Sequence, residues 1–249
     1  ESARKDISLE FGVKTFESLT PELLMSVDAV DVVTPADTHF EIVKKCLKYT
    51  NVFVEKPLST SEKNSIQLDN VAKRYKRILV VGHIFRYHPV SEKLKELLGG
   101  SGLPNKIRGS FINPRSAYRG HEPSIELLHL FDVVNFIWNK KPETVHATRV
   151  EDFVSIVDVS YAKVSNAQFI LGWQGEYKKR AMVFVYSDIT VEADVVDGTI
   201  LVSSKNKPKV YKCPIKMEPL KRELVDFVGA ITGKNKSYVD AKVASNIVS

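Results

Sequence analysis

Three short valine-rich segments, each stopped by proline or glycine, constrain the fold of this chain more than any other feature of its sequence. The segments are residues 30–33, 52–54 and 78–81. Apolar, β-branched runs of this length are typical of parallel strands covered on both faces. Residues 38–49 and 61–75, which lie between them, space their apolar side chains as helices do. This alternation predicts a parallel sheet with right-handed crossovers.

The residues that follow these strands are candidates for a binding site, because ligands of open α/β sheets bind at the carboxyl ends of the strands. The strands are expected to deliver Thr34-Pro35, Glu55-Lys56 and Gly82-His83 to one edge. A lysine such as Lys56, half desolvated at such an edge, can act as an acid or a base. The alternative interpretation of Glu-Lys-Pro is a surface turn with two solvated charges. Ser59 and Glu62 fit a capping box for the next helix.

The segments outside this alternation predict a different second half. Upstream, we expect the tail of a helix at residues 1–7, a short strand at 11–16 and a helical turn at 18–25. Downstream, several strand candidates follow one another between residues 143 and 210 without intervening helices, which predicts an antiparallel sheet. The strand candidates of the second half are 106–113, 154–159, 167–173, 181–186, 189–193 and 199–202, and its helix candidates are 89–98, 122–138 and 219–231.

Composition excludes several classes of protein. The net charge is +6, but the basic residues are scattered among acidic ones, so we expect no nucleic-acid partner. Cys46 and Cys213 fit no metal or redox spacing, which predicts no metal site and a reducing compartment. No run of 18 apolar residues and no signal-peptide pattern occurs, so we expect a cytoplasmic protein with no membrane association.

Four motifs in this order resemble the glucose-fructose oxidoreductase / inositol dehydrogenase / rhizopine-catabolism (Gfo/Idh/MocA) family. They are Asp28-Ala-Val-Asp-Val-Val-Thr-Pro35 with His39, Val54-Glu-Lys-Pro57, Val81-Gly-His-Ile-Phe-Arg-Tyr-His-Pro89, and His129 with Asp132 on a helix that ends near Trp138. The resemblance covers nearly the whole chain. It implies a partial Rossmann domain at residues 1–88 and a domain with an open-faced antiparallel sheet and helices at residues 89–249.

The resemblance also implies an NAD(P)-dependent oxidoreductase acting on a small sugar, polyol or nucleotide sugar. Moving a hydride from a secondary alcohol to a nicotinamide leaves a hydroxyl proton that the protein must accept. By position, Lys56 matches the catalytic lysine, and His129 matches a histidine that contacts the substrate hydroxyl and can relay the proton. The outer face of the antiparallel sheet is implied to form a homodimer or homotetramer.

The cofactor, NAD or NADP, is implied to contact residues from all three strand ends. Glu55 matches a residue beside the nicotinamide ribose. His83 and Arg86 belong to the same edge, although a structural salt bridge explains Arg86 equally well. The loop residues implied to run along the cofactor are Thr34, Pro35 and His39.

Two positions depart from the family pattern. The family usually carries an aspartate four positions before the histidine, where this chain has Ile125. Glu126 lies three positions before His129, on the same helical face, and can replace that aspartate as a third catalytic residue; the alternative is a solvated Glu126. His129 itself can also be a hydrogen-bonded histidine on an apolar helix. A loop before this helix offers Arg115, Tyr118 and Arg119 to a substrate phosphate or hydroxyl, with Asp132 as a further substrate contact.

The second departure is the phosphate-binding fingerprint. The family begins with a Gly-x-Gly-x-x-Gly turn, whereas the glycine cluster here, Gly99-Gly-Ser-Gly102, follows a helix and predicts a helix stop. We expect a sequence shortened at both ends, by roughly 50–60 residues at the start if a βαβ unit takes about 30 residues. The competing hypothesis is a non-catalytic member that serves as a cofactor-sensing or protein-binding module; retention of Lys56 and His129 argues against it.

Overall fold

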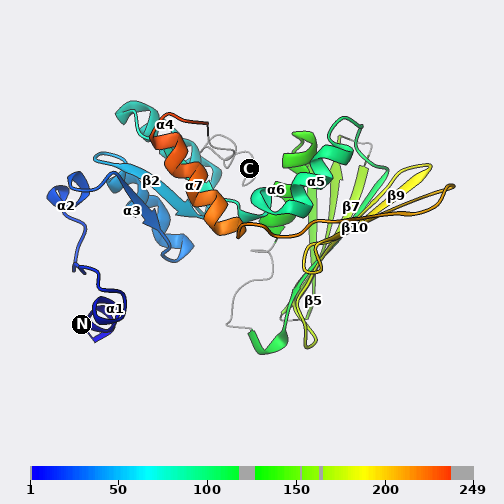
Figure 1. The fold of residues 1–249 in the computed structure, drawn as a ribbon, viewed down its shortest axis with the longest axis horizontal. Coiled ribbons are helices and arrows are strands. Elements are labelled where there is room, and N and C mark those ends of the chain that lie inside the picture. Colours follow the sequence, from blue (N-terminus) through cyan, green and yellow to red (C-terminus); the bar gives the residue numbers. More distant parts are fainter. Residues whose placement is uncertain (1, 118–126, 152, 163–164, 237–249) are drawn as a thin grey trace.

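Two sheets lie side by side in the computed structural model, a small one near the N-terminus and a larger one built by the following residues (Figure 1). The structure describes residues 2–117, 127–151, 153–162 and 165–236. Among these residues, no helix is both long enough and apolar enough to cross a lipid bilayer.

The N-terminal part forms a three-stranded parallel sheet flanked by helices. Its elements are α1 (Ser2–Phe11), α2 (Pro21–Met25), β1 (Ala29–Val32), the 3-10 helix η1 (Ala36–Thr38), α3 (His39–Cys46), β2 (Asn51–Glu55), α4 (Glu62–Tyr75) and β3 (Leu79–Gly82). The strand order is β1-β2-β3, as the alternation of strands and helices predicts. Val52, Phe53 and Val54 of the central strand are all buried, which explains why this run is apolar without alternation.

The strand expected at residues 11–16 is wrong. Helix α1 continues to Phe11 and stops at Gly12, which adopts a left-handed φ of +64° and donates its backbone N–H to Ser8 O. Glycine at this position is a common helix stop because it carries no Cβ. The residues after it have no regular structure, and Phe16 is exposed. Apolar residues form a strand only where a neighbouring strand can accept and donate backbone hydrogen bonds, and none lies beside this segment in the described residues.

The capping box expected from Ser59 and Glu62 is also wrong. Ser61 is the residue before α4, with extended backbone angles, and its hydroxyl accepts from Asn64 N at 3.3 Å. The hydroxyl of Ser59 is buried and instead bonds Ser61 O at 2.7 Å and Ser65 Oγ at 2.9 Å. Ser59 therefore packs beneath the helix, and the N-cap residue is Ser61, two positions later in the chain.

The second part forms an eight-stranded sheet with two helices on one face (Figure 1). Its elements are the 3-10 helix η2 (Ile84–Tyr87), α5 (Pro89–Leu98), β4 (Lys106–Asn113), the 3-10 helix η3 (Arg115–Ala117), α6 (Leu127–Trp138), β5 (Thr144–Glu151), β6 (Val154–Tyr161), β7 (Ser165–Trp173), β8 (Lys179–Val185), β9 (Ile189–Asp194), β10 (Thr199–Ser204) and β11 (Lys209–Lys212). The expected strands are all present. The strand order is β11-β10-β9-β8-β4-β7-β6-β5.

This sheet is mixed, whereas the sequence predicts an antiparallel one. Strand β4 lies between β7 and β8, pairing with β7 in parallel and with β8 in antiparallel fashion. Strands β7 and β8 run in opposite directions, so any strand inserted between them must be parallel to one of the two. From sequence alone, strands that follow one another in the chain are expected to pair. This expectation does not reveal that β4, which comes earlier in the chain, lies between β7 and β8.

The core of this part lies between the sheet and helices α5 and α6. Phe111, Phe169 and Phe184 are buried on the inner face, and Leu130 of α6 packs against them. Gly109 of β4 allows this close approach, because a Cβ there would lie 2.7 Å from the Phe169 ring and 3.0 Å from Leu130 Cδ2. The distance between α6 and the sheet is therefore set by a residue without a side chain.

Helix α7 (Pro219–Ile231), although last in the described chain, lies against the first sheet (Figure 1). Phe227 is buried with Phe53 and Val80, and the Phe53 and Phe227 ring centroids are 5.6 Å apart. Asp226 accepts from Tyr87 Oη at 2.7 Å. The chain thus returns from the large sheet to cover the small one.

We expect Phe227→Ala to lower the free energy of unfolding by about 3–5 kcal/mol, because it removes a buried aromatic ring and leaves a cavity. Val228→Ala, at the neighbouring position where the side chain is 56% exposed, is the matched control and should cost less than about 0.5 kcal/mol. Urea unfolding followed by circular dichroism measures both. Equal losses in the two variants would mean that α7 is not docked through Phe227.

Candidate active site

The carboxyl ends of the three parallel strands lie level with one another. Val54 of β2 is opposite Val32 of β1 and Val81 of β3, and Glu55 is opposite Gly82. The residues that leave the sheet at this edge are Thr34, Pro35, Lys56 and His83. The register therefore brings the polar groups predicted from three separate motifs to one edge, where open parallel sheets bind their ligands.

His39 joins two of these strand ends. Its ring is buried at the start of α3, with Nδ1 2.7 Å from Pro57 O and Nε2 2.7 Å from Thr34 O. Both partners are carbonyl oxygens, which only accept hydrogen bonds. The neutral ring donates to one of them at a time, and the protonated ring donates to both. His39 therefore ties the Thr34 loop to the Glu-Lys-Pro turn and leaves no ring nitrogen directed at a ligand.

Glu55 lies over Gly82 at the same edge. Its Oε2 accepts from Lys56 N at 3.3 Å, and a Cβ on Gly82 would lie 3.4 Å from that oxygen. Burial raises the pKa of the Glu55 carboxyl, while the neighbouring Lys56 opposes this shift. A Cβ at residue 82 would also lie 3.3 Å from Phe53 Cζ, so a side chain there would require the Phe53 ring to shift slightly.

A buried ion pair connects this edge to the second part of the chain. Arg86 of η2 donates from Nε to Asp132 Oδ1 of α6 at 2.7 Å and from a terminal nitrogen to Asn135 Oδ1 at 2.9 Å. His83 Nδ1 lies 3.6 Å from the other Asp132 oxygen, and burial lowers the pKa of the His83 ring. This geometry supports the salt-bridge interpretation of Arg86, and it places Asp132 in a structural contact.

His129 lies one turn before Asp132, on the same helix. Its ring is 8% exposed and 4.7 Å from the Phe85 ring, and its Nδ1 has no hydrogen-bond partner among the described residues. Burial lowers the pKa of His129 well below 6.5, and the charge of Lys56 is the next largest cause. His129 is therefore neutral at pH 7, and Lys56 is near enough to act on it electrostatically across the boundary between the two parts.

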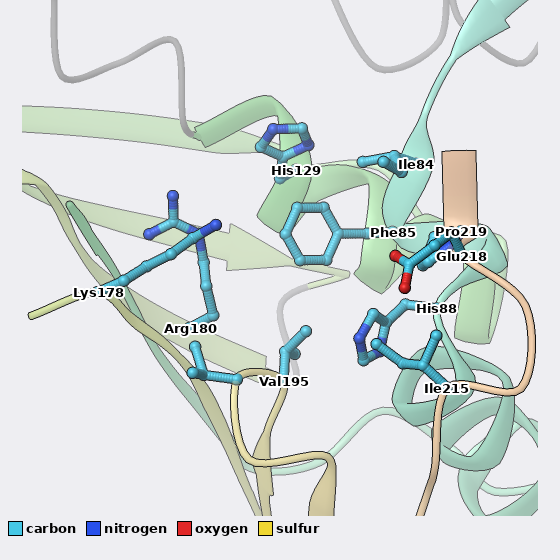
Figure 2. A pocket seen from close by; sticks show the side chains of 11 residues that line it. Ile84, Phe85, His88, His129, Lys178, Arg180, Val195, Ile215, Glu218 and Pro219 are labelled. Carbon is cyan, nitrogen blue, oxygen red and sulfur yellow. The ribbon is translucent and has the colours of Figure 1, made fainter. Parts of the chain in front are cut away.

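A pocket of about 440 Å³ opens beside His129 (Figure 2). This volume is within the range of small-molecule sites. Its walls come from η2, α6, the start of β8 and the segment that leads into α7. The lining residues are Ile84, Phe85, His88, His129, Lys178, Arg180, Val195, Val196, Ile215, Glu218 and Pro219. The pocket thus lies between the large sheet, helix α6 and the residues that follow strand β3.

Several predicted site residues lie elsewhere or cannot be placed. Glu126 and Tyr118 fall outside the described residues. Arg115 is exposed on η3, its guanidinium stacks 3.0 Å from the Phe153 ring centroid, and it does not line the pocket. Among the residues that sequence reasoning missed, Lys178 and Arg180 line the pocket beside His129. Their alternation at a strand start could have indicated one shared face, but the expected strand began only at residue 181.

A second missed residue is Glu223 of α7. It is 1% exposed, and burial raises its pKa to about 8, with the charges of Glu55 and Asp132 adding to the shift. An acid on an amphipathic helix is normally assumed to face solvent. Glu223 is instead buried near Glu55 and Asp132, because α7 returns to the first sheet, which the local sequence does not reveal.

The raised pKa of Glu223 predicts a pH-dependent stability. The folded protein holds this proton up to about pH 8, whereas the unfolded chain releases it near 4.5. Stability is therefore lost as the pH rises between these values, by up to about 1.4 kcal/mol per pH unit. Glu223→Gln carries no titrating group, and we expect it to lose less stability than the parent between pH 5.5 and 8.5.

Urea midpoints measured across this pH range test the expectation. The other titrating groups are common to both proteins, so the difference between the two curves isolates Glu223. Glu192→Gln, at an exposed position of β9, is the control and should follow the parent. Parallel curves for the parent and Glu223→Gln would contradict a protonated Glu223.

Comparison with known proteins identifies the family. Residues 1–83 match the Gfo/Idh/MocA oxidoreductase family, which is described as having an NAD-binding Rossmann fold. The chain is 22% identical to UDP-N-acetylglucosamine 3-dehydrogenase of Acidithiobacillus ferrooxidans over 263 residues, which cover 98% of this chain and 82% of that protein. It is 30% identical to myo-inositol 2-dehydrogenase of Thermotoga maritima over 158 residues, 59% of this chain and 47% of the relative.

Solved structures share the fold over the whole chain. KijD10, a 3-ketoreductase from Actinomadura kijaniata in complex with TDP-benzene and NADP, matches with a TM-score of 0.83 and 18% identity, covering 100% of this chain and 83% of that one. Biliverdin reductase from Synechocystis, in complex with biliverdin and NADP+, matches with a TM-score of 0.85 and 16% identity, covering 100% and 85%. Since these two act on different substrates, the fold alone does not name one. Residues 1–83 thus match the NAD-binding Rossmann domain of the Gfo/Idh/MocA oxidoreductase family, and the chain as a whole shares the fold of these solved oxidoreductases.

Proposed function

We propose that this protein transfers a hydride between a nicotinamide cofactor and a secondary alcohol or ketone of a sugar-like substrate, with Lys56 and His129 handling the proton. One observation carries the proposal. Lys56 leaves the sheet at the cofactor edge, His129 lines the pocket of the other part, and the charge of Lys56 lowers the pKa of His129. This electrostatic influence of Lys56 on His129 supports one shared site at the junction of the two parts.

The strand edge fits the cofactor. Thr34 and Pro35 are exposed beyond β1, Glu55 is half-buried at the end of β2, and His39 links the loops that follow the two strands. We propose that these loops, with Lys56, border the nicotinamide and its ribose. The nicotinamide, when bound, accepts or supplies the hydride. The protein supplies the geometry of the edge and the group that exchanges the hydroxyl proton.

Lys56 is proposed to exchange that proton directly. In oxidation, the neutral Nζ amine accepts the proton of the substrate hydroxyl as the hydride leaves the same carbon. In reduction, the ammonium returns a proton to the developing alkoxide oxygen. The positive charge of the ammonium also stabilises negative charge on that oxygen in either direction.

His129 is proposed to hold the substrate hydroxyl and to pass the proton onward. A neutral imidazole can accept a hydrogen bond at one nitrogen and donate one from the other. The positive charges that lower the His129 pKa keep the ring neutral at pH 7, so it retains both abilities. Its buried Nδ1, without a hydrogen-bond partner in the described part of the chain, is available to a ligand group.

The substrate class follows from the relatives and the pocket together. The relatives named above act on UDP-N-acetylglucosamine and myo-inositol, both polyhydroxylated rings. The pocket of about 440 Å³ beside His129 combines apolar walls with a few polar groups, as small-molecule sites do. We propose a sugar, polyol or nucleotide sugar as the substrate.

We expect Lys56→Ala to lower turnover by about 10²–10⁴-fold, because it removes the group that exchanges the hydroxyl proton. Nicotinamide absorbance follows turnover with NAD+ and NADP+ against a panel that includes UDP-N-acetylglucosamine and myo-inositol. Lys48→Ala, at an exposed lysine of the same part, is the control and should retain parental turnover. Full activity in Lys56→Ala would refute the proton role, and an inactive parent that still binds the cofactor would favour a non-catalytic module.

We further propose a homodimer or homotetramer formed through the outer face of the large sheet. The helices α5 and α6 cover the inner face, and in the described residues no helix covers the other (Figure 1). Val145 and Ile170 are exposed large apolar side chains on this sheet. Light scattering of the purified protein should give a dimer or tetramer mass. A monomer at micromolar concentration would remove the interface.

We propose the cytoplasm as the compartment. Cys46 and Cys213, both buried, are free thiols in the structure. Free thiols fit a reducing compartment.

A further inference from the structure

Two cations line one wall of the pocket beside His129. Lys178 and Arg180 stand two positions apart at the start of β8, and Figure 2 shows both side chains on the same side of the pocket. Lys179, between them, is not among the lining residues and is paired with Ile112 in the sheet. Lys178, which directly precedes β8, and Arg180 of β8 therefore give the pocket two positively charged lining residues, and Lys179 between them is not part of the lining.

Arg180 is a fixed charge. It is 5% exposed, and its guanidinium donates to Ile112 O at 2.9 Å and to Asn113 Oδ1 at 2.7 Å. It also lies over the Phe111 ring, 5.0 Å from the centroid. Carbonyl and amide oxygens accept these hydrogen bonds, and an arginine stays protonated throughout the physiological pH range. The charge is thus held in place at the pocket wall.

Lys178 adds a second positive charge beside Arg180, on a flexible side chain. The side chain is exposed at the pocket rim, and a lysine there can turn its ammonium towards a ligand. Both cations act inside the pocket, since both lower the pKa of the His129 ring. Glu218, the acid among the lining residues, lies on the far side of the pocket in Figure 2. The wall formed by Lys178 and Arg180 is therefore positive.

We propose that Lys178 and Arg180 form a subsite for a phosphate group carried by the sugar substrate, so that the substrate is a sugar phosphate ester such as a nucleotide sugar. The inference rests on the proposed function, because it places the reacting ring at His129 and the phosphate beside β8. A diphosphate linker carries two negative charges and meets two positive ones here. The loop residue Arg115, the sequence-based candidate for this role, lies outside the pocket.

The test compares Lys178→Gln with Lys179→Gln. Each variant removes one positive charge from neighbouring exposed positions, but only residue 178 lines the pocket. The probes are UDP, UDP-N-acetylglucosamine, N-acetylglucosamine and glucuronate. Calorimetry measures binding in the presence of NADH or NADPH, and nicotinamide absorbance measures turnover. We expect Lys178→Gln to raise the Kd of UDP and of UDP-N-acetylglucosamine by about tenfold or more. The KM for UDP-N-acetylglucosamine should rise with little change in kcat. Lys179→Gln should match the parent in both measurements.

The outcomes separate this subsite from the proposed function. If UDP binding depends on Lys178 but no hydride transfer occurs, the subsite is supported and the proposed function is refuted. Hydride transfer from the neutral sugar to NAD+ or NADP+ that is unaffected by Lys178→Gln, with no UDP binding, keeps the proposed function and overturns the subsite. Equal losses in the two variants overturn it as well, because they indicate a general charge effect. Turnover of glucuronate that depends on Lys178, with none for the UDP sugar, overturns the phosphate assignment.

Discussion

The buried ion pair between Arg86 and Asp132 is the interaction on which the arrangement of the site depends. Arg86 follows the last strand of the cofactor sheet, and Asp132 belongs to the helix that carries His129. Removing one partner of such a pair leaves an uncompensated charge in the interior, which is strongly destabilising, so the pair holds its two elements in register. Arg86 belongs to η2, which follows strand β3 of the small sheet, so the pair ties the end of that sheet to the helix that carries His129.

Helix α7 reinforces the same junction from the other side. Arg222 donates to Tyr87 O at 2.6 Å and to Glu92, while Phe227 packs on the small sheet. The return of α7 also buries Glu223 near Glu55 and Asp132. The charge of Lys56 acts on the pKa values of Glu55, His83 and His129, which lie in three segments far apart in sequence. Such clusters of perturbed groups are typical of catalytic sites.

The elements themselves follow from local sequence. The apolar run of β2, the proline that starts α5 and the amphipathic spacing of α7 are each decided by burial and backbone geometry within a few residues. The failures have equally local causes. The segment after Gly12 has the apolar composition of a strand but no partner, and Ser59 is drawn into the packing below α4 although it occupies a plausible cap position. Sequence patterns describe propensity, whereas pairing and burial decide the outcome.

The sequence by itself determined the parallel sheet, the strand ends that carry Thr34, Glu55 and Lys56, and the match of residues 1–83 to the Gfo/Idh/MocA family. Those features repeat at short range, because a strand, its stop and the next helix are adjacent in the chain. Only the tertiary structure decided that β4 enters between β7 and β8, that α7 buries Glu223, and that Lys178 and Arg180 face His129. These depend on contacts between segments tens of residues apart, for which a single sequence holds no periodic pattern.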